Sequence, residues 1–551
     1  MNYIFKKSNL IYLLFFLILC VGFSISRDFG IGIEEHFQRK SGFYWLNYIL
    51  SFTNFNSLKF EVLERINDIN LFTPNLPPIE KFSYYGVIFD LPLALIESIL
   101  KINDPQNYFL LRHNSIFCIF LFSAFFFYKI ILDRFKNLYL ANFGFLIYVF
   151  SPRIFGNIFF DNKDILFLSI ITFNFYFFYN YLKNNSLKNL FFLSIFCALS
   201  TSTRIIGLLM PLSFLFIIFL KSLSENKLIE NLKILIFFIF FYIIFLFLHW
   251  PYLWTLSFDQ WANFFNPFFQ AMNPTVFFNG EYYQSKYLPI SYLPLWVILT
   301  TPVYITVLSC LGFLFKIKRS FKRYIRIDRD TKKVGHELWS SRRENFDFVI
   351  FINFLLVILL YFSVNLALLS GWRHFYFLNF FLIYFTCFSV YLILNKLRKS
   401  RSKIIFLFGF LFFFLFIQIF DVYKYHPFQS SYFNNLVSKN KKENFEIDTQ
   451  SLSRVHALKE ILKEPMDYIL IGTGSWTPLA NARSSIPKKM WDKLKFVGTN
   501  YENADFIYSN HYYEVDINYN KKYQIPKNFS LYKTFSIDGT KIYSIYKRNK
   551  K

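Results

Sequence analysis

Residues 151–182 read SPRIFGNIFFDNKDILFLSIITFNFYFFYNYL, and this stretch decides the class of the fold. Its second half is apolar and long enough to cross a hydrocarbon core of about 30 Å as a helix. Its first half places Arg153, Asp161, Lys163 and Asp164 before or at the start of that helix. The sequence therefore predicts a membrane helix with a charged cluster at one end.

The same apolar pattern recurs along the whole chain. Of its 551 residues, 54% are hydrophobic and 17% are charged, whereas about a quarter would be charged in a soluble protein. We predict an α-helical polytopic membrane protein with about eleven transmembrane helices. Their expected ranges are 9–26, 114–132, 139–150, 164–182, 190–203, 205–220, 234–250, 291–315, 347–369, 375–394 and 404–420. This pattern excludes a soluble enzyme, a disordered chain and a fibrous protein.

The net charge of +25 is distributed unevenly between the two ends of these helices. With the N-terminus in the cytoplasm, the cytoplasmic segments hold 25 basic and 7 acidic residues, many of them in Lys316–Arg343 and Lys396–Lys403. The long outside loops 27–113 and 251–290 hold 9 basic and 12 acidic residues. Because positive loops face the cytoplasm, this asymmetry predicts a multi-pass membrane protein with a cytoplasmic N-terminus. The basic excess is thus explained by topology, and no nucleic-acid partner is expected.

Three regions are expected outside the bilayer core. Loop 27–113 contains an apolar segment, Tyr84–Leu100, that carries acidic residues and reads as an interfacial amphipathic helix. Loop 251–290 is rich in aromatic residues, as at the headgroup level of membranes. Residues 436–551 are more polar and predict a small α/β domain outside the membrane, whereas 1–435 form the membrane module. The elements expected in the C-terminal domain are a helix at Val455–Leu462, strands at Tyr468–Ile471 and Ala504–Tyr508, and a hairpin at Phe535–Tyr546 around Asp538-Gly539.

An acidic group follows the first predicted span. Asp28, Glu34 and Glu35 lie close together in sequence, the last two in Ile31–His36. A carboxylate at the membrane surface can act as general base towards an acceptor hydroxyl or amine. The alternative is a solvated acidic pair on a loop.

The charged cluster before the fourth span suggests a second chemical role. Arg153 and Lys163 can clamp a phosphate, and Asp161 or Asp164 can orient a sugar or help to bind a divalent cation. The alternative is an interfacial salt-bridge cluster. Arg204, between two apolar stretches, and Arg373, in the turn Gly371–Tyr376, are further candidates for phosphate contact, because charge at membrane depth is costly. The neighbouring His374 has no second ligand at metal-binding spacing, which favours a structural role.

Together these residues resemble the GT-C fold glycosyltransferases that use polyprenyl-phosphate-linked sugars, a group that includes protein O-mannosyltransferases and lipid A aminoarabinose transferases. The resemblance covers residues from about 1 to 435 and rests on Glu34-Glu35, Arg153–Asp164, Trp250-Pro251-Tyr252 and Gly371–His374. The strings SPRIFGNIFFDNKD, GWRHFYF and YHPFQSSYFN look like an uncharacterised bacterial branch of such enzymes.

The resemblance implies an activity and a set of residue roles. Glu34 or Glu35 would activate the acceptor, with Asp28 as a further candidate, because the family's acidic pair contains an Asp where this chain has Glu-Glu. Arg153, Asp161, Lys163, Asp164, Arg204, Arg373 and His374 would bind the donor phosphate and sugar. The implied reaction transfers a sugar from a polyprenyl-phosphate donor to a glycan, lipid or protein of the cell envelope at the periplasmic face, with inversion at the sugar carbon.

Two other functions fit these residues less well. A transporter or flippase of lipid-linked glycans predicts inverted repeats and interrupted helices near the midplane, whereas no repeat is visible and the charges gather at loop edges. An envelope assembly protein with merely anchoring spans has little reason to place Arg204 or Asp164 at membrane depth.

Overall fold

A computed structural model describes residues 9–73, 75–225, 228–269, 273–324, 342–364, 366–512 and 521–549. Within these residues, eight helical segments are long and apolar enough to cross a membrane. They comprise α2 (Leu10–Ile25), α7 (Pro105–Phe135), α10 (Asp164–Asn184), α12 (Leu209–Glu225) with the preceding turn, α13 (Leu228–His249), α18 (Arg342–Ser363), α19 (Leu378–Leu397) and α20 (Arg401–Lys424). Two shorter apolar helices, α8 (Leu138–Val149) and α11 (Leu187–Thr203), match the third and fifth predicted spans. The chain is therefore a helical, multi-pass membrane protein, as predicted.

The predicted span 291–315 is divided into two helices. α16 (Tyr292–Thr300) ends before Thr301, whose backbone is extended, and α17 (Val303–Tyr324) begins after Pro302. Because proline disfavours helical backbone at the residue before it and lacks an N–H donor, the break falls where Thr301 meets Pro302.

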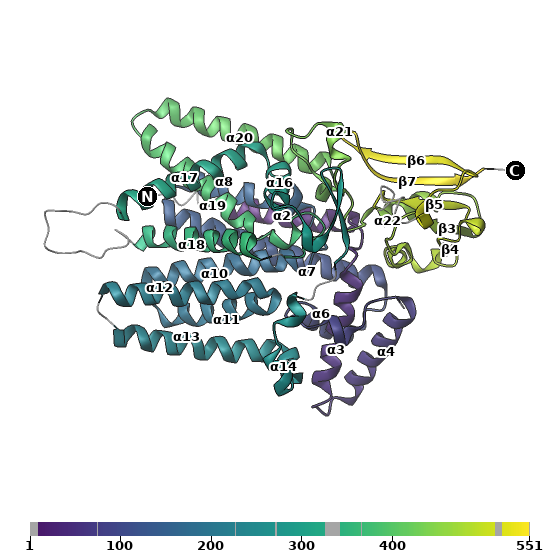
Figure 1. The fold of residues 1–551 in the computed structure, drawn as a ribbon, viewed down its shortest axis with the longest axis horizontal. Coiled ribbons are helices and arrows are strands. Elements are labelled where there is room, and N and C mark those ends of the chain that lie inside the picture. The colour runs from purple at the N-terminus through teal and green to yellow at the C-terminus, as the bar shows by residue number, and fades with distance from the viewer. Residues whose placement is uncertain are drawn as a thin grey trace.

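The helices of the bundle run along the long axis of the molecule (Figure 1). The end of α17 and the starts of α18 and α20 lie at one end of the bundle, together with the basic residues of Lys396–Lys403. The first loop and the C-terminal sheet lie at the opposite end, in agreement with the separation of charge read from the sequence. Residues 325–341 of the other basic cluster lie outside the described residues. The assignment of the basic end to the cytoplasm stays a prediction.

The first loop folds into a small helical layer made of α3 (Glu35–Leu50), α4 (Asn56–Phe72) and α6 (Asp90–Ile99). Its core joins apolar residues of all three helices, including Phe43, Val62 and Ala94. The segment expected as an interfacial helix contains the ten-residue α6, which buries Leu93 and Ala94 and is too short to span a membrane. Short helices elsewhere are α5 (Ile79–Phe82), α9 (Pro152–Phe155), α14 (Phe258–Ala262), α15 (Asn266–Phe269), α21 (Lys439–Lys442) and α22 (Ser453–Ile461).

The C-terminal region forms a five-stranded mixed sheet with strand order β4-β3-β5-β7-β6. The strands are β3 (Ile469–Thr473), β4 (Leu494–Gly498), β5 (Phe506–Ser509), β6 (Phe529–Ile537) and β7 (Thr540–Arg548). β3 pairs in parallel with β4 and β5, and β7 pairs antiparallel with β5 and β6. The predicted helix, two strands and hairpin are confirmed, and Asp538 and Gly539 adopt the positive φ angles of a two-residue hairpin turn. β4 was not predicted, because only the first of its five residues is buried and the strand shows no clear alternation.

The aromatic loop contains a hairpin that the sequence analysis did not anticipate. β1 (Thr275–Phe278) and β2 (Glu281–Gln284) pair antiparallel across Asn279-Gly280, where both φ angles are positive. A single antiparallel bridge joins Phe278 to Phe445 and attaches the hairpin to the C-terminal region.

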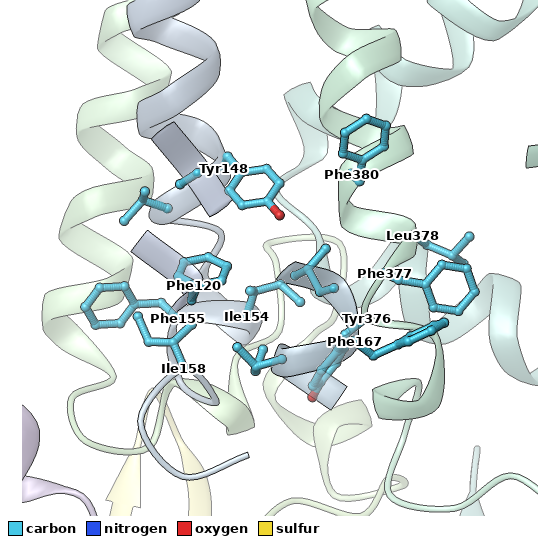
Figure 2. Packing of buried hydrophobic residues seen from close by; sticks show 14 of the residues in the cluster. Phe120, Tyr148, Ile154, Phe155, Ile158, Phe167, Tyr376, Phe377, Leu378 and Phe380 are labelled. Atoms are coloured by element: carbon cyan, nitrogen blue, oxygen red, sulfur yellow. The ribbon is translucent and has the colours of Figure 1, made fainter. Parts of the chain in front are cut away.

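Aromatic side chains pack in the centre of the bundle. Figure 2 shows Phe120 and Tyr148 near Ile154 and Phe155, with Tyr376 and Phe377 alongside. The buried Tyr148 hydroxyl is satisfied by Thr172 Oγ1 at 2.8 Å. Arg153 lies in the same short helix as Phe155, and Arg373 lies three residues before Tyr376. The packing of these neighbours therefore holds both arginines in position.

Candidate functional site

Four chain segments meet at the end of the bundle opposite the basic clusters. Glu34 stands at the N-terminus of α3, and Arg204 occupies an extended residue where α11 ends. Arg373 begins a single 3₁₀ turn, residues 373–375, just before α19. Asp161 Oδ1 accepts a hydrogen bond from the Asp164 amide at 2.9 Å, which satisfies a free N–H at the start of α10. The structure thus brings together charges that are hundreds of residues apart in sequence.

Two arginines and two carboxylates form the centre of this site. The Arg373 guanidinium donates to Glu34, and its Nε lies 4.0 Å from Asp164 Oδ2. Arg204 donates to the other oxygen of Asp164. The side chains of Arg373, Asp164 and Arg204 are 6%, 2% and 13% exposed. Buried charge of this density is stable only because each group has an opposite partner.

The Arg373 ion pair controls the protonation of Glu34. Desolvation opposes ionisation of this carboxyl, but the positive charges of Arg373 and Lys163 outweigh it and lower the pKa of Glu34 to about 2. Glu34 is therefore ionised and paired with Arg373 in this structure.

Lys163 and Asp161 have pKa values closer to neutral. Burial and the neighbouring Arg204 lower the pKa of Lys163 to about 7, and its ammonium lies 3.4 Å from the centre of the Tyr85 ring. Burial and the adjacent Asp164 raise the pKa of Asp161 to about 8. Burial, Arg204 and Arg373 hold the pKa of His374 well below its ordinary value, so its imidazole is neutral.

Glu35 and Asp28, the other two candidates for the base, face different partners. Glu35 is 2% exposed, accepts from the Gly32 amide at 2.7 Å and lies 3.0 Å from His113 Nε2. Asp28 pairs with His426 Nε2 at 2.9 Å. Of the three acids, the structure thus places Glu34 among the arginines.

Arg153 occupies a separate buried position beside the same turn. Its guanidinium lies 4.5 Å from the Trp296 ring centre, and its Nε and Nη1 have no hydrogen-bond partner. Among the described residues, no ion pair joins Arg153 to the carboxylates of the site. Gly371 adopts a φ of +70°, and a Cβ there would lie 3.1 Å from the Arg153 guanidinium, so both backbone and space require glycine.

The site includes residues outside the predicted set. Asp90 of α6 accepts from Arg112 at 2.8 Å and from Asn162 at 3.2 Å, and burial raises its pKa to about 6. Asp90, Lys163 and Tyr85 line a small cavity of about 50 Å³. Asp90 is one of the acidic residues in the apolar segment Tyr84–Leu100, and Arg112 directly precedes the second predicted span, but nothing in the sequence linked Tyr85 to Lys163.

The divalent cation considered above has no candidate site among the described residues. Within the described part of the chain, no three His, Cys, Asp or Glu side chains form a group that could hold a metal ion. Glu34 and Asp164 instead have arginine partners.

No known protein family model matches the chain, and no curated protein matches it. Among solved structures, ArnT from Cupriavidus metallidurans is similar over 98% of both chains at 9% sequence identity. The TM-score is 0.47 for its apo crystal structure and 0.46 for the crystal structure bound to undecaprenyl phosphate. At this identity and score, the likeness assigns neither a substrate nor an acceptor to this chain.

Proposed function

We propose that the chain is a membrane glycosyltransferase that moves a sugar from a polyprenyl-phosphate donor to an envelope acceptor at the periplasmic face of a bacterial inner membrane. The observation that carries this proposal is the meeting of Arg373, Arg204 and Lys163 with Glu34 at one end of an apolar bundle. A lipid-linked phosphate presents one charged group at the edge of the bilayer, where these cations lie. The acceptor is a glycan, a lipid or a protein.

The donor phosphate would bind to the cations. Two guanidiniums can each give paired N–H donors to phosphate oxygens, and Lys163 adds a point charge. Arg373 and Arg204 each keep an Nε without a hydrogen-bond partner, so both have donors left for a ligand. The same charges stabilise the phosphate as it leaves with the electron pair of the sugar–oxygen bond.

Glu34 would serve as the general base. A phosphate that draws Arg373 away weakens the ion pair that keeps the pKa of Glu34 low, so the carboxylate becomes more basic as the donor binds. Glu34 then accepts the proton of the acceptor hydroxyl while the acceptor oxygen bonds to the anomeric carbon. The bond from that carbon to the phosphate oxygen breaks on the opposite side, with inversion.

The test is release of polyprenyl phosphate by the full chain in liposomes supplied with labelled polyprenyl-phosphate hexoses and pentoses and with cell-envelope extract as the source of acceptor. We expect wild type to release it and Glu34→Gln to do so about 100-fold more slowly, in line with loss of a general base. Glu64→Gln, an exposed position on α4, is the matched control and should behave as wild type. Movement of intact donor across the membrane without cleavage would instead identify a transporter.

Lys163 predicts a pH dependence of donor binding. With a pKa of about 7, the Lys163 side chain is a charged ammonium below neutral pH and a neutral amine above neutral pH. Affinity for a polyprenyl-phosphate sugar should therefore rise about three- to tenfold as the pH falls through 7. Equilibrium binding between about pH 5.5 and 8.5 measures this. Lys163→Arg stays charged over this pH range, so its donor affinity should change only weakly, near pH 8, where Asp161 titrates. If this variant keeps the wild-type pH profile, a group other than Lys163 causes the pH dependence of binding.

A further inference from the structure

A cavity lies away from the charged site, where the β1–β2 hairpin meets the C-terminal region. Its volume is about 440 Å³, within the range of small-ligand sites. Two backbone links close one side of it: the bridge between Phe278 and Phe445, and a hydrogen bond of 3.0 Å from the Gly280 amide to the Asn444 carbonyl. The other side is formed by Asn510 and by Thr540 of the sheet.

One wall of the cavity is aromatic. Phe277 and Tyr282 are directly opposite in the hairpin register, and their ring centres are 4.9 Å apart with a 40° tilt. Both line the cavity. Residues opposite each other in a two-stranded sheet point to the same face, so the hairpin presents a paired aromatic surface to the interior.

The opposite wall carries buried polar side chains. Glu446 is 6% exposed; its Oε1 accepts from the Phe277 amide at 3.1 Å, and its carboxyl also hydrogen-bonds with the Tyr512 side chain. Thr540 is 1% exposed, and its Oγ1 has no hydrogen-bond partner. A buried polar atom without a partner is unfavourable, so a bound molecule that brings a hydroxyl group to Thr540 would stabilise it.

The cavity has little net charge to attract an ion. Lys541 and Glu443, which also line it, lie 3.9 Å apart and offset each other. Burial raises the pKa of Glu446 to about 8, so this carboxyl is protonated at neutral pH and offers both a donor and an acceptor.

We propose that this cavity binds a neutral saccharide unit, with its apolar ring face on Phe277 and Tyr282 and its hydroxyls on Glu446, Thr540 and Asn444. Aromatic rings beside neutral hydrogen-bonding groups match a sugar, which carries C–H faces and hydroxyl edges. The assignment of this sugar to the acceptor rests on the proposed glycosyltransferase function. The binding of a saccharide in the cavity does not depend on that function.

The experiment measures binding of cellobiose and of N,N′-diacetylchitobiose to the full chain without donor. Saturation-transfer NMR and calorimetry serve as readouts, in a zwitterionic detergent because maltoside detergents would compete. We expect wild type to bind at least one disaccharide, and Phe277→Ala, Glu446→Leu and Thr540→Val each to weaken binding about tenfold. Glu446→Gln keeps a donor and an acceptor and should retain most of the affinity. Tyr468→Ala and Thr499→Val, exposed positions outside the cavity, are matched controls.

Absence of binding in wild type, or equal binding in wild type and the cavity variants, would overturn the proposal. Release of polyprenyl phosphate by the same preparations separates the two ideas. Saccharide binding without donor cleavage contradicts only the enzyme, whereas donor cleavage without saccharide binding contradicts only this cavity assignment.

Discussion

Replacing Arg373 with Ala should slow polyprenyl phosphate release about 100- to 1,000-fold, the usual effect of removing one donor to a developing anion. Arg373 is central because it contacts both Glu34 and Asp164 from a buried position. Its loss removes positive charge from the leaving phosphate and frees Glu34 from its partner. The measurement is initial rate with saturating donor, so that weaker binding does not mask the change in turnover.

Two variants control this prediction. Arg398→Ala removes an exposed arginine just beyond the other end of α19 and should leave the rate unchanged. Arg373→Lys keeps the charge but not the paired donors, so we expect an intermediate rate. A rate for Arg373→Ala within twofold of wild type, from protein with normal thermal stability, would remove this arginine from the donor site.

Replacing Arg39 with Leu should destabilise the protein by about 3–5 kcal/mol, because it leaves Glu97 buried without its partner. Arg39 Nε lies 3.1 Å from both carboxylate oxygens, and the two side chains are 5% and 1% exposed. The guanidinium also stacks 3.7 Å from the centre of the Tyr108 ring. The pair joins α3 to α6, so its loss should unfold the layer whose first helix begins directly after Glu34. Denaturant unfolding in detergent micelles measures the change.

The control for stability is Lys40→Leu, the next residue of α3, which should change stability by less than about 0.5 kcal/mol. The double variant Arg39→Met with Glu97→Leu replaces both charges by apolar groups and should recover most of the loss. If the single and double variants are equally unstable, shape rather than charge holds the two helices together.

Much of the fold could be read from local patterns. The length of each apolar run depends on neighbouring residues alone, so α10, α19 and α20 were predicted to within about four residues, whereas α13 begins six residues before its predicted start. The alternation around Asp538-Gly539 likewise defines a hairpin without reference to the rest of the chain. The β1–β2 hairpin was missed because its residues sit in a loop already explained as an aromatic belt.

The sequence by itself determined that this is a multi-pass membrane protein, where its charges are concentrated, and which acids and arginines are costly enough to need partners. The tertiary structure decided which partner each one has. Glu34 and Arg373 are 339 residues apart, and no local pattern connects them. Successive residues at the start of a helix point about 100° apart, so Glu34 reaches the arginines while Glu35 reaches His113. Pairing depends on where distant helices end in space, and that is set by the packing of the whole bundle.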